Sequence, residues 1–262
     1  MLGPRPKKSL GQSFLVNEWI AIAEAEHANA KNVLEMGPGR GILTNELCRW
    51  AKKVVAVEKD EQLYNMLKYS MHEKNLKLIN KDFFDATDKE LELNTIDIMI
   101  SNIPYMLSSK TIEWLSQKKM QAVLCLQKEF VDHMTAEADT DKYSRLSVIC
   151  SLSFRVTKIM DVTKGNFRPI PKVDSSLVYM KPKDVKITDM ERKIISAMMQ
   201  HKKKTVRNAM MDSEREFGKS KQEMAAIMEK IYLRDQRVFK ITPTEILSIA
   251  KELSNDLQMP IR

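Results

Sequence analysis

The sequence predicts an α/β fold in which a doubly wound parallel sheet is followed by a small all-α domain. In the first half of the chain, short β-rich runs alternate with helical segments, and this alternation is typical of βαβ units. In the last third the periodicity is helical, with Met190, Ile194 and Met198 recurring on one face. We therefore expect one domain over residues 1–183 and a second over residues 184–262.

The individual elements follow from local composition. Residues 1–17 are basic and contain Pro4, Pro6 and Gly11, which indicates an extended arm, whereas residues 18–30 are rich in Ala and Glu, which favours a helix. Short apolar runs with β-branched residues indicate strands. The expected strands are Asn32–Met36, Lys53–Glu58, Leu76–Ile79, Ile96–Ser101 and Gln121–Gln127. The expected helices between them are Ile42–Trp50, Glu61–Glu73 and Ser109–Gln117.

Composition and charge limit the kinds of partner that the protein can have. The chain has 262 residues, of which 43% are hydrophobic and 30% charged, values typical of a folded globular protein. The formal net charge is +8, and residues 185–262 hold 16 Lys and Arg against 11 Asp and Glu. This surplus favours a polyanionic partner, either nucleic acid or an acidic membrane surface, although a basic protein without such a partner has the same composition.

Cysteine usage and hydropathy exclude several classes of protein. Cys48, Cys125 and Cys150 are widely spaced, with no CxxC pair, so we expect neither a metal site nor a disulfide framework, and a reducing compartment. No apolar run approaches the roughly 20 residues of a membrane span. Glu24 and Glu26 interrupt the apolar stretch after Trp19, which argues against a signal peptide. We therefore expect a cytoplasmic protein without membrane contact.

A glycine-rich turn joins the first expected strand to the next helix. It has the sequence Gly37-Pro38-Gly39-Arg40-Gly41, and glycines there permit positive φ and close approach of a ligand to the backbone. A dinucleotide fingerprint would require a third glycine at position 42, where this chain has Ile42. This weakens the hypothesis of a nicotinamide cofactor. The carboxylate of Glu58, at the end of the second strand, suits both hydroxyls of a ribose. These residues predict a nucleoside site, with a ligand-free tight turn as the alternative.

Two residues after the third strand suit an adenine ring. Asp82 is placed to accept a hydrogen bond from an adenine amine, and Phe83 to pack against the ring. The alternative for Asp82 is a helix cap or a turn residue.

The segment Asn102-Ile103-Pro104-Tyr105 follows the fourth strand, where a sheet of this kind places its active site. The side-chain oxygen of Asn102 and the backbone carbonyl of Pro104 are two acceptors for an amine on an aromatic base, and they stabilise the positive charge that develops when the amine attacks a methyl sulfonium. Tyr105 supplies a stacking face. The segment predicts methylation of such an amine with S-adenosyl-L-methionine; a buried turn is the alternative.

These motifs together resemble the ribosomal RNA adenine dimethyltransferase family, and the resemblance covers nearly the whole chain. Lys8-Ser9-Leu10-Gly11-Gln12-Ser13-Phe14-Leu15 is similar to the family's N-terminal cofactor motif, although many members carry Asn or His where this chain has Ser13. The resemblance implies the following cofactor-binding residues: Gln12, Ser13, Leu15, Gly37, Gly39, Glu58, Asp82, Phe83 and Asn102. It implies a catalytic segment over residues 102–105.

Two later segments extend the resemblance. Residues 166–175 are similar to a family motif whose aromatic residue, here Phe167, clamps the target adenine opposite Tyr105. The run His201-Lys202-Lys203-Lys204-Thr205-Val206-Arg207-Asn208 is similar to the family's basic helix in the C-terminal domain, which favours phosphate contact. The C-terminal sequence resembles archaeal or eukaryotic-type members more than bacterial ones. Core packing and a solvated helix face are the respective alternatives. The expected RNA-binding residues are Lys202, Lys203, Lys204 and Arg207.

The resemblance implies a Rossmann-like class I methyltransferase domain followed by a basic helical RNA-binding domain. It implies transfer of methyl groups to N6 of two adjacent adenines near the 3′ end of small-subunit rRNA in a pre-ribosomal particle, by a protein that we expect to be a monomer without metal. Three alternatives stay open: a large-subunit rRNA adenine methyltransferase of the antibiotic-resistance type, a ribosome assembly factor whose catalysis is secondary, and a Rossmann-like protein of unrelated activity.

Overall fold

The computed structural model describes residues 4, 6–7 and 11–258. Residues 8–10 of the N-terminal motif and part of the expected arm over residues 1–17 therefore lie outside the described residues. The chain divides into two compact units. The first consists of residues 1–131 and 155–182, and the second of residues 132–154 and 183–262.

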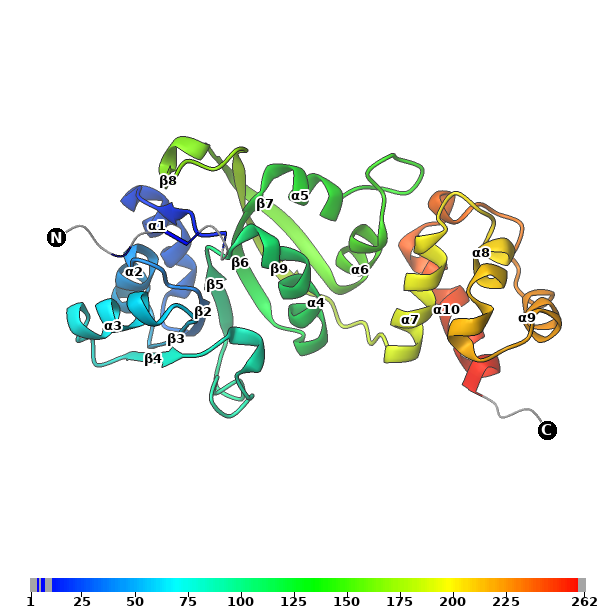
Figure 1. Ribbon diagram of the computed structural model, residues 1–262, viewed down its shortest axis with the longest axis horizontal. Helices are drawn as coiled ribbons and strands as arrows, with labels where there is room; N and C mark the ends of the chain where they lie inside the picture. The colour runs from blue at the N-terminus through cyan, green and yellow to red at the C-terminus, as the bar shows by residue number, and fades with distance from the viewer. Residues whose placement is uncertain (1–3, 5, 8–10, 259–262) are drawn as a thin grey trace. The chain divides into compact units, whose positions relative to one another are not determined.

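The first unit is built on a seven-stranded sheet with the order β4-β3-β2-β5-β6-β9-β7 (Figure 1). The neighbours from β4 to β6 pair in parallel, and β9 pairs antiparallel with β6. The strands are β2 (Asn32–Met36), β3 (Lys53–Glu58), β4 (Leu76–Asn80), β5 (Ile98–Ser101), β6 (Gln121–Gln127), β7 (Phe154–Val162) and β9 (Ser175–Pro182). A separate two-stranded sheet joins β1 (Phe14–Leu15) to β8 (Phe167–Arg168) in antiparallel fashion.

Helices cover the sheet, and they begin and end close to the positions that the sequence predicts. The helices of this part of the chain are α1 (Glu18–Ala25), α2 (Ile42–Trp50), α3 (Glu61–Ser70), α4 (Ser108–Lys118) and α5 (Lys128–Met134). Short 3₁₀ turns occur at η2 (Glu26–Ala28), η3 (Phe83–Asp85), η4 (Tyr105–Leu107) and η5 (Lys164–Asn166). Helix α3 ends three residues before the expected Glu73.

Alternation along the strands sorts their side chains onto two faces. One face packs against α1 and α2 and includes Val33 on β2, Val54 on β3, Ile100 on β5 and Val123 on β6, all fully buried. Central parallel strands are buried on both sides, which explains why β2, β3 and β6 read as nearly continuous apolar runs. The carboxyl ends of these parallel strands meet at one edge of the sheet, and the connections after them build the site described below.

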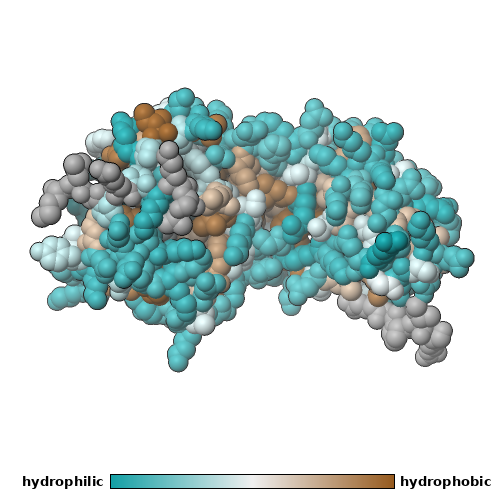
Figure 2. Space-filling view, viewed as in Figure 1, coloured by the Kyte–Doolittle hydropathy of each residue, from teal (hydrophilic) through white to brown (hydrophobic). Residues whose placement is uncertain are grey.

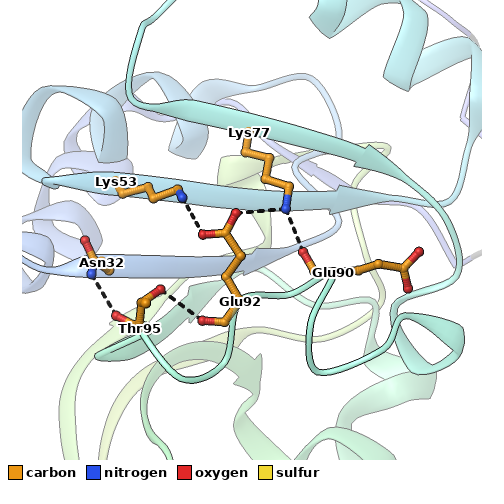
Figure 3. Close-up of polar contacts among 6 residues, drawn as sticks. All are labelled: Asn32, Lys53, Lys77, Glu90, Glu92 and Thr95. Carbon is orange, nitrogen blue, oxygen red and sulfur yellow. Dashed lines mark hydrogen bonds and ion pairs between the residues drawn. The ribbon is translucent and has the colours of Figure 1, made fainter.

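The opposite, amino edge of the sheet is held by a polar cluster (Figure 3). The carboxylate of Glu92 pairs with Lys53 on β3 and, at 2.8 Å, with Lys77 on β4. The Asn32 side-chain amide donates to the backbone carbonyl of Thr95 at 2.7 Å. These contacts tie the connection between β4 and β5 to the sheet, and Glu92 has a left-handed backbone conformation with φ of 54°.

The second unit is a helical bundle with a methionine-rich core. Its helices are α6 (Arg145–Ser153), α7 (Asp189–Gln200), α8 (Val206–Asp212), α9 (Lys221–Met228) and α10 (Pro243–Gln258), with 3₁₀ turns η6 (Glu214–Phe217) and η7 (Val238–Lys240). Met198, Met210 and Met224 are fully buried in this core. The hydroxyl of Tyr143, also fully buried, donates to the backbone carbonyl of Ile241 at 2.9 Å, so the one polar atom of this ring is satisfied.

The predicted fold class is confirmed: a Rossmann-like α/β sheet is followed by helices. All five expected strands are present, and within the described part of residues 183–262 only a single bridge, between Thr205 and Arg237, interrupts the helical pattern. The structure adds β7 and β9, which the sequence does not signal. The expected domains over residues 1–183 and 184–262 assign functions to parts of the chain, and these assignments stay predictions.

The surface is mainly hydrophilic in the view of Figure 2, with apolar residues gathered only in small patches. None of the helices in the described ranges combines the length and the apolar character that a bilayer-spanning segment needs.

Candidate active site

The glycine turn between β2 and α2 forms one wall of a cavity at the carboxyl edge of the sheet. Gly37, Gly39 and Gly41 all have positive φ, of 70°, 60° and 82°, a region that residues with a Cβ rarely adopt. At Gly39 a Cβ would lie 2.9 Å from the ring of Phe14. The turn therefore presents bare backbone to the cavity, as close approach of a ligand requires.

Glu58 lies at the end of β3, directly beside this turn. Its two carboxylate oxygens accept hydrogen bonds from the backbone N–H of Gly39 at 3.0 Å and of Asp60 at 2.8 Å. Burial raises the pKa of Glu58, and the hydrogen bonds from Asp60 and Gly39 oppose that rise. Each oxygen keeps a further lone pair, so the carboxylate both fixes the glycine turn and retains acceptors for a hydroxyl-bearing ligand.

Asp82 and Phe83 line the same cavity. One carboxylate oxygen of Asp82 accepts from the backbone N–H of Phe84 at 3.0 Å and caps η3, and the other pairs with Lys59 at 2.7 Å. The hydrogen bond from Lys59 lowers the pKa of Asp82. The capping alternative is thus realised, yet a capping carboxylate at the cavity wall still has acceptor capacity. Phe83 is buried and packs edge-on against Trp114.

All four residues of the segment after β5, Asn102 to Tyr105, line the cavity. The amide oxygen of Asn102 is buried and has no hydrogen-bond partner among the described residues. The carbonyl of Pro104 accepts from the N–H of Leu107 at 2.8 Å, which leaves it one further lone pair. The Tyr105 hydroxyl lies 2.7 Å from the Ser175 hydroxyl, and burial raises the pKa of Tyr105.

The N-terminal strand β1 closes one side of the cavity. It pairs with β8 so that Phe14 faces Arg168 and Leu15 faces Phe167. This pairing explains how Phe167, which is far from β1 in the sequence, comes to line the same cavity as Tyr105. Leu15 does not line the cavity and lies in the buried core of the first unit.

Gln12 and Ser13 line the cavity, but their side chains already have partners in this structure. The Gln12 amide donates to Asp60 at 3.3 Å and accepts from the backbone N–H of Lys7 at 2.7 Å. The Ser13 hydroxyl donates to the carbonyl of Pro169 at 2.6 Å. Ser13 therefore ties β1 to the segment after β8, and its backbone is what remains available for a ligand.

The cavity brings together residues from widely separated parts of the chain. The residues that the sequence predicts and that line it are Gln12, Ser13, Gly37, Gly39, Glu58, Asp82, Phe83, Asn102, Pro104, Tyr105 and Phe167. Sequence reasoning missed Phe14, Lys59 and Cys125, which also line it. Phe14 adjoins the predicted Ser13 in the N-terminal motif, so the motif itself was the available signal; Lys59 and Cys125 carry no local one.

The basic residues of the second unit differ in how they are held. The ammonium group of Lys202 donates to the backbone carbonyl of Tyr143 at 2.6 Å. Lys204 pairs with Asp212, and Arg207 pairs with Glu229 at 2.9 Å. Lys203 is exposed, and no ion pair involving it occurs among the described residues. Only part of this basic run is therefore free for phosphate contact without breaking an existing interaction.

No group of three or more His, Cys, Asp or Glu side chains arranged to hold a metal ion occurs within the described ranges.

Comparison with known proteins defines what this site belongs to. The family described as "Ribosomal RNA adenine dimethylase" matches residues 4–255. A protein of Pyrococcus abyssi named "Probable ribosomal RNA small subunit methyltransferase A" is 35% identical over 256 residues, covering 96% of this chain and 93% of that protein. The protein of the same name from Methanococcus maripaludis is 35% identical over 265 residues, covering 97% and 98%.

Solved structures agree with this result. The crystal structure of a dimethyladenosine transferase from Plasmodium falciparum aligns with a TM-score of 0.75 and 25% identity, covering 93% of this chain and 98% of that chain. The 23S rRNA methyltransferase ErmE aligns with a TM-score of 0.62 and 21% identity, covering 92% and 99%; at that identity the likeness shows a shared fold.

The fold and the site define an S-adenosylmethionine-dependent methyltransferase of the Rossmann-like class. The residues present fit this cofactor, because a glycine turn that a Cβ would obstruct, a buried carboxylate and an asparagine with an unpartnered amide oxygen all line one cavity. More specifically, the chain belongs to the ribosomal RNA adenine dimethylase family, and its methyl donor is S-adenosyl-L-methionine.

Proposed function

We propose that this protein transfers methyl groups from S-adenosyl-L-methionine to N6 of two adjacent adenines near the 3′ end of small-subunit rRNA. The observation that carries the proposal is the buried, unpartnered amide oxygen of Asn102 in the same cavity as the glycine turn. An acceptor left without a donor costs about 1–3 kcal/mol, and the N–H of a target amine would satisfy it. The names of the archaeal relatives support the small-subunit substrate.

In this proposal the cofactor lies along the wall formed by the glycine turn and the acidic residues. Gly37 and Gly39 leave room beside the methionine part, Glu58 accepts from the ribose hydroxyls, and Asp82 accepts from the adenine amine, with Phe83 beside the ring. The backbone of Gln12 and Ser13 covers the methionine side, and Leu15 acts indirectly by anchoring β1 in the core. When bound, the cofactor supplies an electrophilic methyl group on a positively charged sulfur.

The chain's own residues orient the amine that accepts this methyl group. The Asn102 amide oxygen and the remaining lone pair of the Pro104 carbonyl accept the two N–H groups, which draws the nitrogen lone pair out of conjugation with the ring. Tyr105 and Phe167 hold the adenine ring, which has to leave its stack to enter the cavity. Positioning and electrostatics then do most of the catalysis, and the amine proton passes to water after transfer.

The helical second unit is proposed to hold the RNA backbone. Lys203 provides a cation without a competing carboxylate, while Lys204 and Arg207 exchange Asp212 and Glu229 for phosphates. Lys202 supports this surface through its hydrogen bond to the Tyr143 carbonyl. The substrate is proposed to be a pre-ribosomal particle, and the protein to act as a monomer in the cytoplasm, with residues 1–183 as the methyltransferase domain and residues 184–262 as the RNA-binding domain.

The large-subunit alternative rests on ErmE, whose likeness to this chain extends to the fold alone. Mapping the modified nucleotide separates the two substrates.

A labelled-cofactor assay tests the proposed function. Pre-30S-like particles are incubated with the protein and S-adenosylmethionine labelled in the methyl group, and Asn102→Ala serves as the matched variant because it removes the amide with its acceptor oxygen. We expect label on RNA adenine with the natural chain and a strong reduction with the variant. Label on protein or DNA but never on RNA adenine would overturn the proposal. Normal particle maturation with the variant would instead favour an assembly role.

A further inference from the structure

A carboxyl group is buried behind the catalytic segment without a hydrogen-bond partner. Glu24 lies on the inner side of α1 with Ile20, Ala21 and Ala25, and its side chain is 0% exposed. Neither of its carboxyl oxygens has a hydrogen bond among the described residues. Acidic side chains are almost never fully buried unless they are paired, so this position calls for a physical reason beyond helix packing.

Strand alternation brings Glu24 next to the site. Side chains two positions apart lie on the same face of a strand, so Glu35 shares the face of Val33, and Cys125 that of Val123. Asn102 continues the alternation of Ile98 and Ile100. This is the face that packs against α1. Glu24 is therefore enclosed by α1, β2, β5 and β6, with the Asn102 side chain among its neighbours.

The polar groups around Glu24 are few. Among the described residues, those that act on its carboxyl are Asn102, as a hydrogen-bond donor, and the titratable groups Glu35 and Cys125. The Asn102 amide lies near enough to influence the carboxyl, yet the carboxyl oxygens and the Asn102 oxygen all lack a hydrogen bond of good geometry. The Glu24 carboxyl thus lies next to the Asn102 amide, and the oxygens of both groups are buried without a partner among the described residues.

We infer that Glu24 is a positioning residue for Asn102, and that its carboxyl determines which end of the Asn102 amide faces the cavity. This inference rests on the proposed function. An ionised carboxylate has only acceptors, so it attracts the amide NH₂ and turns the amide oxygen toward the target amine. A protonated carboxyl also has a donor, which bonds the amide oxygen and holds it inside the protein. The ionised form is therefore the productive one.

Burial raises the pKa of Glu24 to about 8, so its carboxyl loses its proton within the pH range in which methyl transfer can be measured. Glu35 has its pKa raised to about 8 for the same reason and is the necessary control. The Cys125 thiol stays protonated throughout, because burial raises its pKa well above the ordinary value. A titration of kcat that depends on Glu24 must disappear when Glu24 is replaced and survive when Glu35 is replaced.

The experiment measures kcat and KM for methyl transfer to RNA across pH values from about 6.5 to 9.5 in the natural chain, Glu24→Gln and Glu35→Gln. We expect kcat of the natural chain to rise with pH through about 8. Glu24→Gln has no ionised form, so the pH-dependent rise disappears. Because its amide offers a donor as well as an acceptor, the preference for one orientation of Asn102 is lost and kcat at high pH falls by roughly 10- to 100-fold, while the affinity for S-adenosylmethionine, measured by calorimetry, is unchanged. Glu35→Gln should keep the rise.

A second variant guards against a folding defect. Glu24→Met replaces the unpaired carboxyl with an apolar side chain of similar volume, which buried sites commonly accept, and it should also remove the pH-dependent rise. If either folded variant keeps the kcat and the pH profile of the natural chain, Glu24 is merely buried and the inference is wrong. If the natural chain itself transfers no methyl group to RNA, the proposed function fails instead, and the two failures are distinct.

Discussion

Replacing Gly39 with alanine should weaken both the fold and the cofactor site, by more than the same change at Gly37. Both glycines have positive φ, of 60° and 70°, so a Cβ at either position costs about 1–2 kcal/mol in backbone strain. At Gly37 the added Cβ finds its nearest neighbour, Pro104, at 3.9 Å, which is ordinary contact. Gly37→Ala is therefore the control for strain alone.

At Gly39 the added Cβ also meets the Phe14 ring, with carbons at 2.9 and 3.1 Å. Phe14 cannot move freely, because β1 pairs with β8 and the Arg40 guanidinium lies 5.1 Å from the ring centre. Overpacking of this kind costs a further 1–3 kcal/mol or so. We expect Gly39→Ala to lower the free energy of unfolding by about 2–5 kcal/mol in total, against about 1–2 for Gly37→Ala.

Urea denaturation measures the two losses, and calorimetry measures the affinity for S-adenosylmethionine. Because Phe14 lines the cavity, its displacement should weaken cofactor binding in Gly39→Ala beyond any effect of Gly37→Ala. Equal losses of stability in the two variants would show that Phe14 does not press on this turn.

Three further predictions follow from the same contacts. Asn102→Ala should lower kcat by about 10²–10³ with little change in cofactor affinity, measured by label transfer and calorimetry; weaker cofactor binding as the main effect would assign Asn102 a different role. Lys203→Ala should reduce the salt dependence of RNA binding, measured by filter binding, by about one counterion without destabilising the helical unit. Lys202→Ala should lower the thermal stability of that unit, measured by thermal melts, because Lys202 donates to the Tyr143 carbonyl. The pKa of Glu24 is raised from 4.5 to about 8, so between these pH values the folded chain holds a proton that the unfolded chain releases. The free energy of unfolding is therefore highest below about pH 4.5 and falls as the pH rises to about 8, and Glu24→Gln should reduce that slope by about 1.4 kcal/mol per pH unit. An unchanged slope in urea titrations would show that Glu24 does not hold this proton.

The central part of the fold could be predicted because its signals are local. Buried parallel strands such as Asn32–Met36 and Gln121–Gln127 are nearly continuous apolar runs, and each is followed or preceded by a clear turn or helix. Strand β7 was missed because it is exposed along most of its length. Its place in the sheet depends on β9, and such pairing at the end of a sheet leaves little trace in either segment.

The residues of the candidate site also divide into those with a local sequence signal and those that depend on contacts distant in sequence. Glu58, Asp82 and Asn102 could be predicted because each follows a strand that the sequence reveals, and parallel strands bring their carboxyl ends together. The Lys59 partner of Asp82 and the Ser175 partner of Tyr105 depend on side chains far apart in sequence. Glu24 was hidden in an Ala- and Glu-rich helix, where an acidic residue is ordinarily at the surface, and only the packing of α1 shows it to be buried.

Mass spectrometry of adenosines in rRNA treated with this protein and S-adenosylmethionine identifies the methylated atom and its position. We expect N6,N6-dimethyladenosine at two neighbouring positions close to the 3′ end of the small-subunit rRNA, and none after treatment with Asn102→Ala. Methyl groups found only on large-subunit rRNA, or on atoms other than the exocyclic nitrogen of adenine, would contradict the proposed function.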